Sequence, residues 1–314
     1  MPLLRFLPEA TKINFVGARY VAFAIDGLLL LASIVSIAIH GFNLGIDFTG
    51  GVSLEVKTAQ HIDIGQLRSQ VDSLGFKESQ IQYVGGGQCD VPLESCALIR
   101  VQPQSDEANE AASKKIIARL GSGYTVRANN TVGPKVSGEL LHAGVLATLL
   151  AVLAIGGWVA VRFEWQYGIS AALATGHDVL VTAGLFSILH LDFTLTSIAA
   201  LLTLAGYSIN DTVVVFDRIR ENRRKYKRMN LGDLINLSTN QMLTRTILTS
   251  AATAVSLVPL LIYGGPSLFD FSAAILFGIV VGTFSSIYVA AALLLYLPAP
   301  AGSFDANTPA EANA

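Results

Sequence analysis

Six long apolar runs constrain this chain more than any other feature of its sequence. They cover residues 20–39, 141–161, 167–189, 194–216, 246–263 and 271–297. A helix needs about 20 mostly apolar residues to cross a lipid bilayer. Only 14% of the 314 residues are charged, whereas about a quarter are charged in ordinary soluble domains. The sequence therefore predicts an α-helical polytopic membrane protein with six transmembrane helices.

The two ends of the chain are expected to differ from the spans. The first apolar run has a basic front but is too long for a signal-peptide core, and no small-residue cleavage site follows it. We interpret this run as a retained anchor that follows a cytoplasmic segment, residues 1–19. Apolar positions within 2–16 are expected to lie along the membrane surface. Residues 298–314 are small, polar and proline-rich, which predicts a disordered cytoplasmic tail.

The distribution of lysine and arginine predicts the orientation of the chain. The turns at 190–192 and 264–266 contain no basic residue, whereas the loop after the fourth run is rich in them. Those basic residues are Arg218, Arg220, Arg223, Arg224, Lys225, Lys227 and Arg228. Because basic loops stay on the cytoplasmic side, both termini and the 217–245 loop are predicted to be cytoplasmic. This rule accounts for the basic loop without a nucleic-acid partner, and none is expected.

The exported segment, residues 41–137, has the length and the pattern of one small α+β domain. Its patterns predict strands at 52–58, 78–84, 96–102 and 124–132 and helices at 62–74 and 106–120. The order βαββαβ is that of a ferredoxin-like domain. Such a fold serves binding or scaffolding, and by itself it says nothing about chemistry.

Cys89 and Cys96 are the only cysteines, and both lie in the exported domain. An oxidising compartment permits a disulfide between them, and two free thiols are the alternative. Their loop offers too few further ligands for a zinc site. No metal site is therefore expected.

The glycine-rich stretch GIDFTGG, residues 45–51, joins the first apolar run to the first predicted strand. It lacks the GK[ST] ending of a phosphate-binding loop and opens no predicted helix, so that function is not favoured. We interpret it as a tight turn in which Gly50 and Gly51 adopt backbone conformations that other residues avoid.

Asp211 is the strongest functional candidate inside the predicted membrane region. Charged groups at this depth are costly, so they are candidates for function by default. Asp211 lies seven residues before Arg218, about 10 Å along a helix. In the fifth run, Arg245 and Thr249 fall on one helix face and are expected at a comparable depth. These groups predict either a proton relay or a fixed polar clamp between two helices.

Three further polar groups lie in the spans. His177 and Asp178 occur about ten residues into the third run, and as neighbours they point about 100° apart, so they cannot both face one partner. A secondary relay position and a helix-packing pair remain open for them. Asp26 follows Arg19 closely and is expected at the membrane interface. No hydrolase triad, P-loop or metal-ligand cluster is present, so neither an enzyme nor a cofactor is expected.

Several motifs together resemble the SecF family. They are GIDFTGG at 45–51, VGPKVSGEL at 132–140, GHDV at 176–179, GYSINDTVVVFDRIREN at 206–222 and TRTILTS at 244–250. The resemblance implies membership of the resistance-nodulation-division superfamily and a multi-pass place in the bacterial inner membrane. It also implies a SecD partner, the SecYEG channel, YajC as a further candidate partner, and a translocating polypeptide on the periplasmic side. The implied energy source for export is the proton gradient.

The resemblance also implies roles for single positions. Asp211 matches the proton-relay aspartate, with Arg245 and Thr249 as its companions in the fifth span. The two junctions of the exported domain match family motifs through Gly45, Asp47, Gly50, Gly51, Gly133 and Pro134, and Asn210 belongs to the fourth-span motif. Two alternatives stay open, a half-transporter for a small molecule or lipid and a passive assembly factor. Protons and sodium ions also remain alternatives as the coupling ion.

Overall fold

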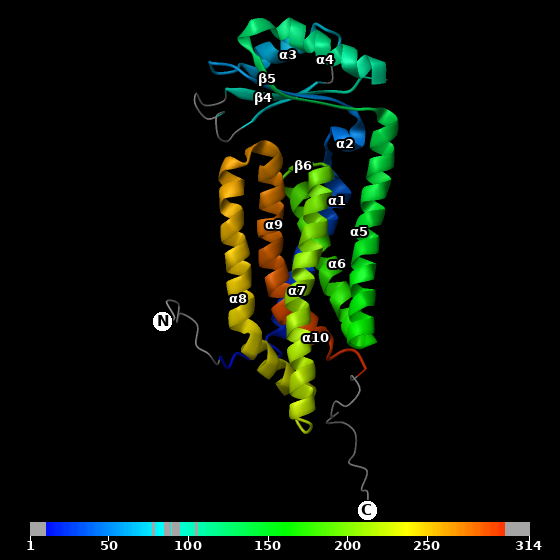
Figure 1. The fold of residues 1–314 in the computed structure, drawn as a ribbon, viewed down its shortest axis with the longest axis vertical. Helices are drawn as coiled ribbons and strands as arrows, with labels where there is room; N and C mark the ends of the chain where they lie inside the picture. Colours follow the sequence, from blue (N-terminus) through cyan, green and yellow to red (C-terminus); the bar gives the residue numbers. More distant parts are fainter. Residues whose placement is uncertain (1–10, 77–78, 85–88, 90–94, 104–105, 299–314) are drawn as a thin grey trace, which may run out of the picture.

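A bundle of long helices carries a small sheet domain at one end (Figure 1). The computed structural model describes residues 11–76, 79–84, 89, 95–103 and 106–298. Within these residues, six helices are long and apolar enough to cross a membrane. The first five are α1 (Arg19–His40), α5 (Pro134–Arg162), α6 (Trp165–Ile188), α7 (Leu195–Lys225) and α8 (Leu231–Tyr263). The sixth combines α9 (Gly265–Ser285), the π-helical turn η3 (Ser286–Ala290) and α10 (Ala291–Leu293).

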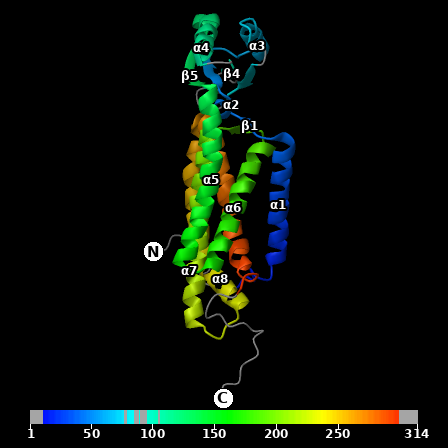
Figure 2. The same ribbon diagram turned by 90° about the vertical axis from the view of Figure 1, so that its right-hand side faces the viewer.

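Helix α6 lies inside the bundle, where it contacts α1, α5, α7 and α9. Its residues and those of the sixth span are mostly buried, whereas α1, α5 and α8 turn large apolar side chains outward. Outward leucine and valine side chains suit contact with lipid or with another membrane protein. Figure 2 shows α1 beside α6 at the edge of the bundle.

The segment predicted as a basic cytoplasmic loop is largely helical. Helix α7 continues to Lys225 and α8 begins at Leu231, so only residues 226–230 connect them. The side chain of Asn230 caps α8 by accepting a hydrogen bond from the Asp233 N–H at 2.8 Å. An ion pair of 2.6 Å between Arg223 and Glu164 holds the extended end of α7 against the start of α6. Capping and this tertiary contact explain why the two helices extend beyond their apolar runs.

Residues 11–16 contact α8 and the sixth span, and the expected position of 2–16 along the membrane surface stays a prediction. The Asn240 side chain bonds Thr11 and the backbone of Ile13, and the Asn236 side chain accepts from the Val16 N–H at 2.9 Å. Phe15 is 3% exposed and packs in a cluster with α8 and the sixth span. The remainder of the expected surface segment, 2–10, and the predicted tail after 298 lie outside the described residues.

The sheet domain contains four strands and two helices in the order βαββαβ. They are β2 (Gly51–Lys57), α3 (Ile64–Asp72), β3 (Gln80–Tyr83), β4 (Cys96–Val101), α4 (Asp106–Leu120) and β5 (Thr125–Val132). The strands pair in the order β3-β4-β2-β5, all antiparallel. Both helices cover the sheet face that points away from the bundle (Figure 1), and Leu54, Leu67, Ile99 and Ile116 are fully buried between them.

Cys89 and Cys96 form a disulfide in the structure. Glu55 lies close enough to both sulfurs to complete a three-ligand cluster. However, the Arg127 guanidinium lies 2.8 Å from the Glu55 carboxylate and 2.7 Å from the Cys89 Sγ atom. A cation there, together with disulfide-bonded sulfurs, makes this cluster unsuitable for a metal ion. Residues 85–88 and 90–94 of the predicted loop lie outside the described residues.

Candidate functional site: buried carboxylates and their link to the sheet domain

The stretch GIDFTGG forms a short helix and then a turn. Helix α2 (Ile46–Thr49) was not predicted, whereas the expected turn follows it at Gly50 and Gly51, with φ angles of 74° and 116°. A Cβ atom on Gly51 would lie 2.3 Å from the Val101 carbonyl oxygen of β4. Gly51 is therefore required both by its backbone conformation and by this close approach.

This stretch is attached to the start of α7. The Asp47 carboxylate accepts a hydrogen bond of 2.9 Å from the backbone N–H of Leu195, the first residue of that helix. A carboxylate at a helix N-terminus also interacts favourably with the helix dipole. The Gly45 N–H donates to the Phe193 carbonyl at 2.8 Å, and a Cβ atom on Gly45 would lie 2.6 Å from the Thr194 side chain. The junction that precedes the sheet domain is thus fixed to the helix that carries Asp211.

The two junctions of the sheet domain also contact each other. Gly133 is the N-cap residue of α5, and Pro134 is its first helical residue, a position that proline favours. A Cβ atom on Gly50 would lie 3.3 Å from the Pro134 Cα atom. Helix α2 packs against α5. The entry into the sheet domain and the exit from it therefore form one packed unit.

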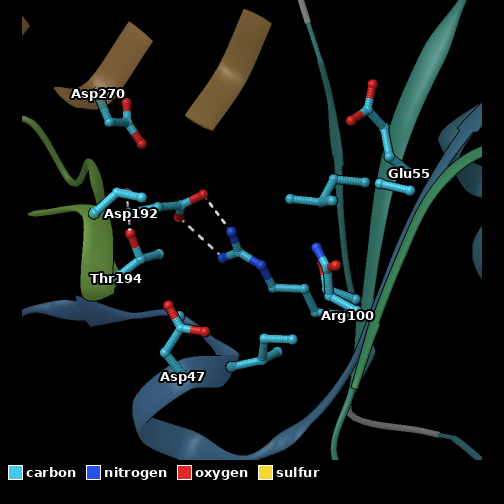
Figure 3. A pocket seen from close by; sticks show the side chains of 13 residues that line it. Asp47, Glu55, Arg100, Asp192, Thr194 and Asp270 are labelled. Carbon is cyan, nitrogen blue, oxygen red and sulfur yellow. Dashed lines mark hydrogen bonds and ion pairs between the residues drawn. The ribbon is translucent and has the colours of Figure 1, made fainter. Parts of the chain in front are cut away.

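A cleft of about 240 Å³ lies between the sheet and the ends of the membrane helices. Arg100 of β4 reaches across it to Asp192, where its Nη1 atom lies 2.9 Å from Oδ1 and its Nη2 atom bonds Oδ2 (Figure 3). Asp192 belongs to β6 (Asp192–Phe193), which pairs in parallel with β1 (Asn43–Leu44). The Asn43 side chain donates to Asp192 at 2.7 Å, and Asp270 of α9 lines the same cleft. Sequence reasoning missed this tie because its two charges are 92 residues apart.

Asp211 of α7 is 4% exposed and is surrounded by hydroxyl groups. The Ser250 hydroxyl of α8 lies 3.4 Å from its Oδ2 atom. Ser250 also accepts from the Tyr207 hydroxyl at 3.1 Å and bonds Thr283 of α9 at 2.7 Å. Three helices thus contribute polar groups to a short chain of hydrogen bonds that ends on this carboxylate.

Arg245 and Thr249 lie on the exposed face of α8 in this single chain. The Thr249 hydroxyl donates to the backbone carbonyls of Arg245 and Thr246 at 3.1 and 3.0 Å. Arg245 lines a cleft of about 520 Å³ with Asp217 and Glu221 of the α7 extension. Among the ion pairs of the described residues, none joins Asp211 to Arg245. Asn210 is also exposed, on the outward side of α7.

A second buried carboxylate, Asp178, lies at the centre of the bundle. It is fully buried and accepts hydrogen bonds from Ser208 of α7 at 2.5 Å and from Ser285 of α9 at 2.9 Å. Its other oxygen lies 3.0 Å from the His177 Nδ1 atom. The His177 Nε2 atom faces α1 instead, 3.4 Å from the Asp26 backbone carbonyl. The two adjacent residues therefore contact different helices, as their angular separation required.

Asp26 is buried against α6, and the expectation that it lies at the depth of the membrane interface stays a prediction. It is 4% exposed, and its Oδ1 atom lies 4.0 Å from the His177 Nε2 atom. The buried residues of α1 are Ala22, Asp26, Ser33 and Ser36. Their spacing places them on one helix face, and that face of small and polar residues was the available signal in the sequence.

The sixth span changes its helical geometry next to Asp178. The π-helical turn η3 begins directly after Ser285, and the Ala290 carbonyl within it accepts a hydrogen bond of 2.5 Å from Ser170 of α6. Such turns occur frequently at functional sites. Composition gave no sign of this turn, because its sequence SIYVA reads as ordinary apolar helix.

Comparison with known proteins identifies the family. The family model described as "Protein export membrane protein SecD/SecF, C-terminal" matches residues 112–299 of this chain. A second family model, described as "SecD/SecF GG Motif", matches residues 35–60. The chain is 39% identical over 305 residues to the protein translocase subunit SecF of Rhodobacter capsulatus, covering 94% of this chain and 91% of that protein. It is 39% identical over 295 residues to the Rickettsia felis protein of the same name, covering 93% and 94%.

Solved structures agree with this assignment. The crystal structure of SecDF, a translocon-associated membrane protein from Thermus thermophilus, superposes with a TM-score of 0.81 and 37% identity. The match covers 93% of this chain but only 39% of the SecDF chain. A second structure, SecDF in a super-membrane-facing form, matches with a TM-score of 0.66 and 38% identity over 94% of this chain and 39% of that one. The chain therefore belongs to the SecD/SecF family of protein export membrane proteins, within which it is a SecF-type translocase subunit.

Proposed function

We propose that this chain uses the proton motive force to promote polypeptide translocation across the bacterial inner membrane, with Asp211 as its proton-carrying group. The observation that carries the proposal is the burial of Asp211 in a membrane-spanning helix, where Ser250 is its hydroxyl partner and Arg245 acts on its charge without an ion pair among the described residues. The names of the relatives support the translocase role, and the family resemblance supports the energy source. No cofactor and no enzymatic step are part of the proposal.

A carboxylate among hydroxyl groups suits a proton relay because it can be charged or neutral in turn. The Ser250 hydroxyl can donate to the ionised form, and it can accept from the protonated form while it donates to Thr283. Moving one elementary charge through the membrane potential supplies about 2.3 kcal/mol per 100 mV. Arg245 and Thr249 would serve the ionised form from the neighbouring face of α8. His177 and Asp178 would form a secondary relay position.

The protonation of Asp211 would reach the sheet domain through α7. Asp47 bonds the start of that helix, and Gly50 contacts the start of α5 at Pro134. A change in the position of α7 would therefore move the packed junctions of the sheet domain. The strand order and the βαββαβ sequence support a ferredoxin-like form for this domain, which would contact the translocating polypeptide on the periplasmic side.

A SecD-like chain is the proposed partner, and the outward face of α7 around Gly206 and Asn210 is the proposed interface. The SecDF structures support this, because the present chain corresponds to only part of their length. The SecYEG channel, with YajC as a further candidate, would complete the export complex. Both termini would be cytoplasmic, and cysteines introduced at Ser122 and Lys227 would be labelled from the periplasmic and cytoplasmic sides respectively.

Replacement of Asp211 by asparagine tests the proposal. Asp211→Asn keeps the size and the hydrogen bonding of the side chain but removes its titration. We expect normal insertion and normal co-purification with the SecD-like chain, while gradient-dependent export falls to the level of a deletion strain. Asp217→Asn, an exposed carboxylate on the same helix, is the matched control and should export normally.

Each other result favours a different function. If Asp211→Asn exports at the wild-type rate, Asp211 is part of a fixed polar clamp between two helices. If Asp211→Asn no longer binds its partner, the chain is better described as a passive assembly factor. Gradient-driven movement of a small molecule or lipid, with no effect on export, would favour the half-transporter. Dependence on sodium in place of the proton gradient would change the coupling ion.

A further inference from the structure

Asp26 is the one carboxylate in the described membrane helices for which burial leaves both oxygens without a hydrogen bond. An ionised carboxylate in such a place costs several kcal/mol unless it is paired. The nearest ionisable group is His177, with its Nε2 atom 4.0 Å from the Asp26 Oδ1 atom. Asp26 is therefore stable either as a neutral carboxylic acid or as the counterion of a protonated His177.

The neighbour of His177 restricts how its ring can be protonated. Asp178 accepts from two hydroxyls, those of Ser208 and Ser285, and from the His177 Nδ1 atom at 3.0 Å. Three donors stabilise the ionised form of Asp178. They also fix a hydrogen on Nδ1, so the Nε2 atom is the one that gains or loses a proton, and this atom faces Asp26.

The proton count of the cluster follows from these contacts. With Asp178 ionised, one proton placed on either Asp26 or His177 Nε2 gives a net charge of −1. A second proton produces a neutral Asp26 beside a protonated His177, and the net charge becomes zero. Each cycle thus takes one proton from the aqueous phase and returns one, with no other reactant.

Within the part of the chain that the structure describes, no other charged group lies where it would fix one of these states. Among the described residues, the charged groups that act on Asp26 are His177 and Asp178, and those that act on His177 are Asp26 and Asp178. Helices α7 and α9 contribute the neutral hydroxyls of Ser208 and Ser285, and α5 approaches this part of α6 with the apolar Val152. The cluster therefore retains a proton whose position and number can change.

We propose that Asp26, His177 and Asp178 form a second proton-binding site, separate from Asp211 and located where α1 meets α6. The inference rests on the proposed use of the proton gradient and extends it to α1, for which the sequence predicted no proton-binding group. A protonated imidazole repels metal cations, so the ligand is a proton and not a sodium ion.

The position of the site gives it a route to the sheet domain that does not pass through α7. Helix α1 ends at His40 and the chain enters β1 at Asn43, directly before GIDFTGG (Figure 2). Nearer its periplasmic end, α1 is held to α6 by a hydrogen bond of 2.8 Å between Ser36 and Ser187. A change of charge at Asp26 therefore acts on the cytoplasmic half of a helix whose other half is fixed.

Infrared difference spectroscopy of the SecD–SecF complex in lipid tests this site. We expect a carbonyl band from a buried carboxylic acid that disappears as the pH rises and is missing from Asp26→Asn. His177→Gln should move the midpoint of this band by about one pH unit or more. The exposed Asp217→Asn is the matched control and should leave both the band and its midpoint unchanged.

Two results would overturn the proposal: an Asp26→Asn spectrum that retains every carbonyl band of the unmodified protein, or a midpoint of the Asp26 band that follows the sodium concentration at constant pH. If Asp26→Asn does not assemble, His177→Gln and Asp26→Glu are measured instead. Infrared spectra of both variants that equal the spectrum of the unmodified protein would exclude the site. In Asp211→Asn the Asp26 band should persist. Failure of the proposed function would appear separately, as normal export by Asp211→Asn.

Discussion

Asp192 lies just before the start of α7 and Asp211 lies within that helix, and the surroundings of these two carboxylates are opposite. Asp192 lies beneath the sheet, bonded by both Nη atoms of Arg100 and by the Asn43 amide. Asp211 lies inside the bundle with a serine hydroxyl at 3.4 Å and no ion pair among the described residues. One carboxylate is matched to a fixed positive charge, and the other is not.

This difference separates structural from functional charge. A carboxylate that accepts charge-assisted bonds from a guanidinium is stabilised in its ionised form and gains little from taking up a proton. A carboxylate among hydroxyls in a low-dielectric region has no such preference, because a hydroxyl can serve either form. We therefore expect Asp192 to act as a mechanical tie and Asp211 to act as the group that changes state.

The largest expected loss of export comes from removing either the titrating group, Asp211, or its cationic neighbour, Arg245. Asp211→Asn and Arg245→Met should each reduce gradient-dependent export to the deletion level, and the double variant should be no worse than either single one. This non-additivity follows if both residues belong to one coupled unit. Export kinetics in inverted vesicles would measure it. Additive losses would mean that the two residues act separately.

A large structural effect is expected at Gly51, where the sheet domain joins the membrane helices. Gly51→Ala places a Cβ atom against the Val101 carbonyl at a φ angle of 116° and should cost about 2 kcal/mol or more. Gly75→Ala is the matched control, because Gly75 has a φ angle of 98° but open space around its Cβ position. Hydrogen exchange of β2 and β4 would report the difference. Equal protection in the two variants would contradict the close approach.

Breaking the tie beneath the sheet should have a moderate effect. The Arg100 and Asp192 side chains are 11% and 18% exposed, so Arg100→Ala leaves Asp192 partly accessible to water. The free energy of unfolding should therefore fall by about 1–2 kcal/mol. Export should fall several-fold and not to the deletion level. The double variant that exchanges the two charges, Arg100→Asp with Asp192→Arg, should restore part of the lost export. Arg119→Ala, an exposed arginine of α4, is the control for charge alone.

How much of this could be predicted from the sequence depended on whether the signal was local. The apolar runs specified six spans, and the alternation of patterns gave the order of strands and helices in the sheet domain. The extension of α7 to Lys225 and the start of α8 at Leu231 could not be predicted in the same way, because the first depends on the contact between Arg223 and Glu164 and the second on the Asn230 cap. Local sequence describes a helix that can form, but tertiary contacts decide where it ends.

The candidate site followed the same rule. Asp211 was identified because a carboxylate deep in an apolar run is conspicuous by itself. Its hydroxyl partner Ser250 lies on another helix and was not identified, although it neighbours the predicted Thr249. The burial of Asp26 was not predicted, because distance from Arg19 measures depth along α1 but not which face α6 covers. Arg100 and Asp192 were missed because their pairing exists only after the sheet domain has folded back onto the bundle.

The smallest expected effect concerns Asp47, which joins the two regions compared above. Its carboxylate accepts from the Leu195 N–H, so Asp47→Asn keeps an acceptor and loses only the charge at the helix N-terminus, a cost of about 0.5 kcal/mol. Asp47→Ala removes the bond as well and should cost about 1 kcal/mol. Hydrogen exchange at the first turn of α7 would rank the two variants.

The control for Asp47 is Asp63, which caps α3 within the sheet domain by accepting from the Gly65 N–H at 2.7 Å. Asp63→Ala should destabilise that domain by a similar amount without loosening α7. Because Asp47 has a fixed donor, as Asp192 does, Asp47→Asn should lower export less than twofold. Loss of export in Asp47→Asn at normal assembly would place Asp47 with Asp211 among the titrating groups. The presence of a fixed hydrogen-bond donor would then no longer distinguish structural carboxylates from carboxylates that change their protonation state.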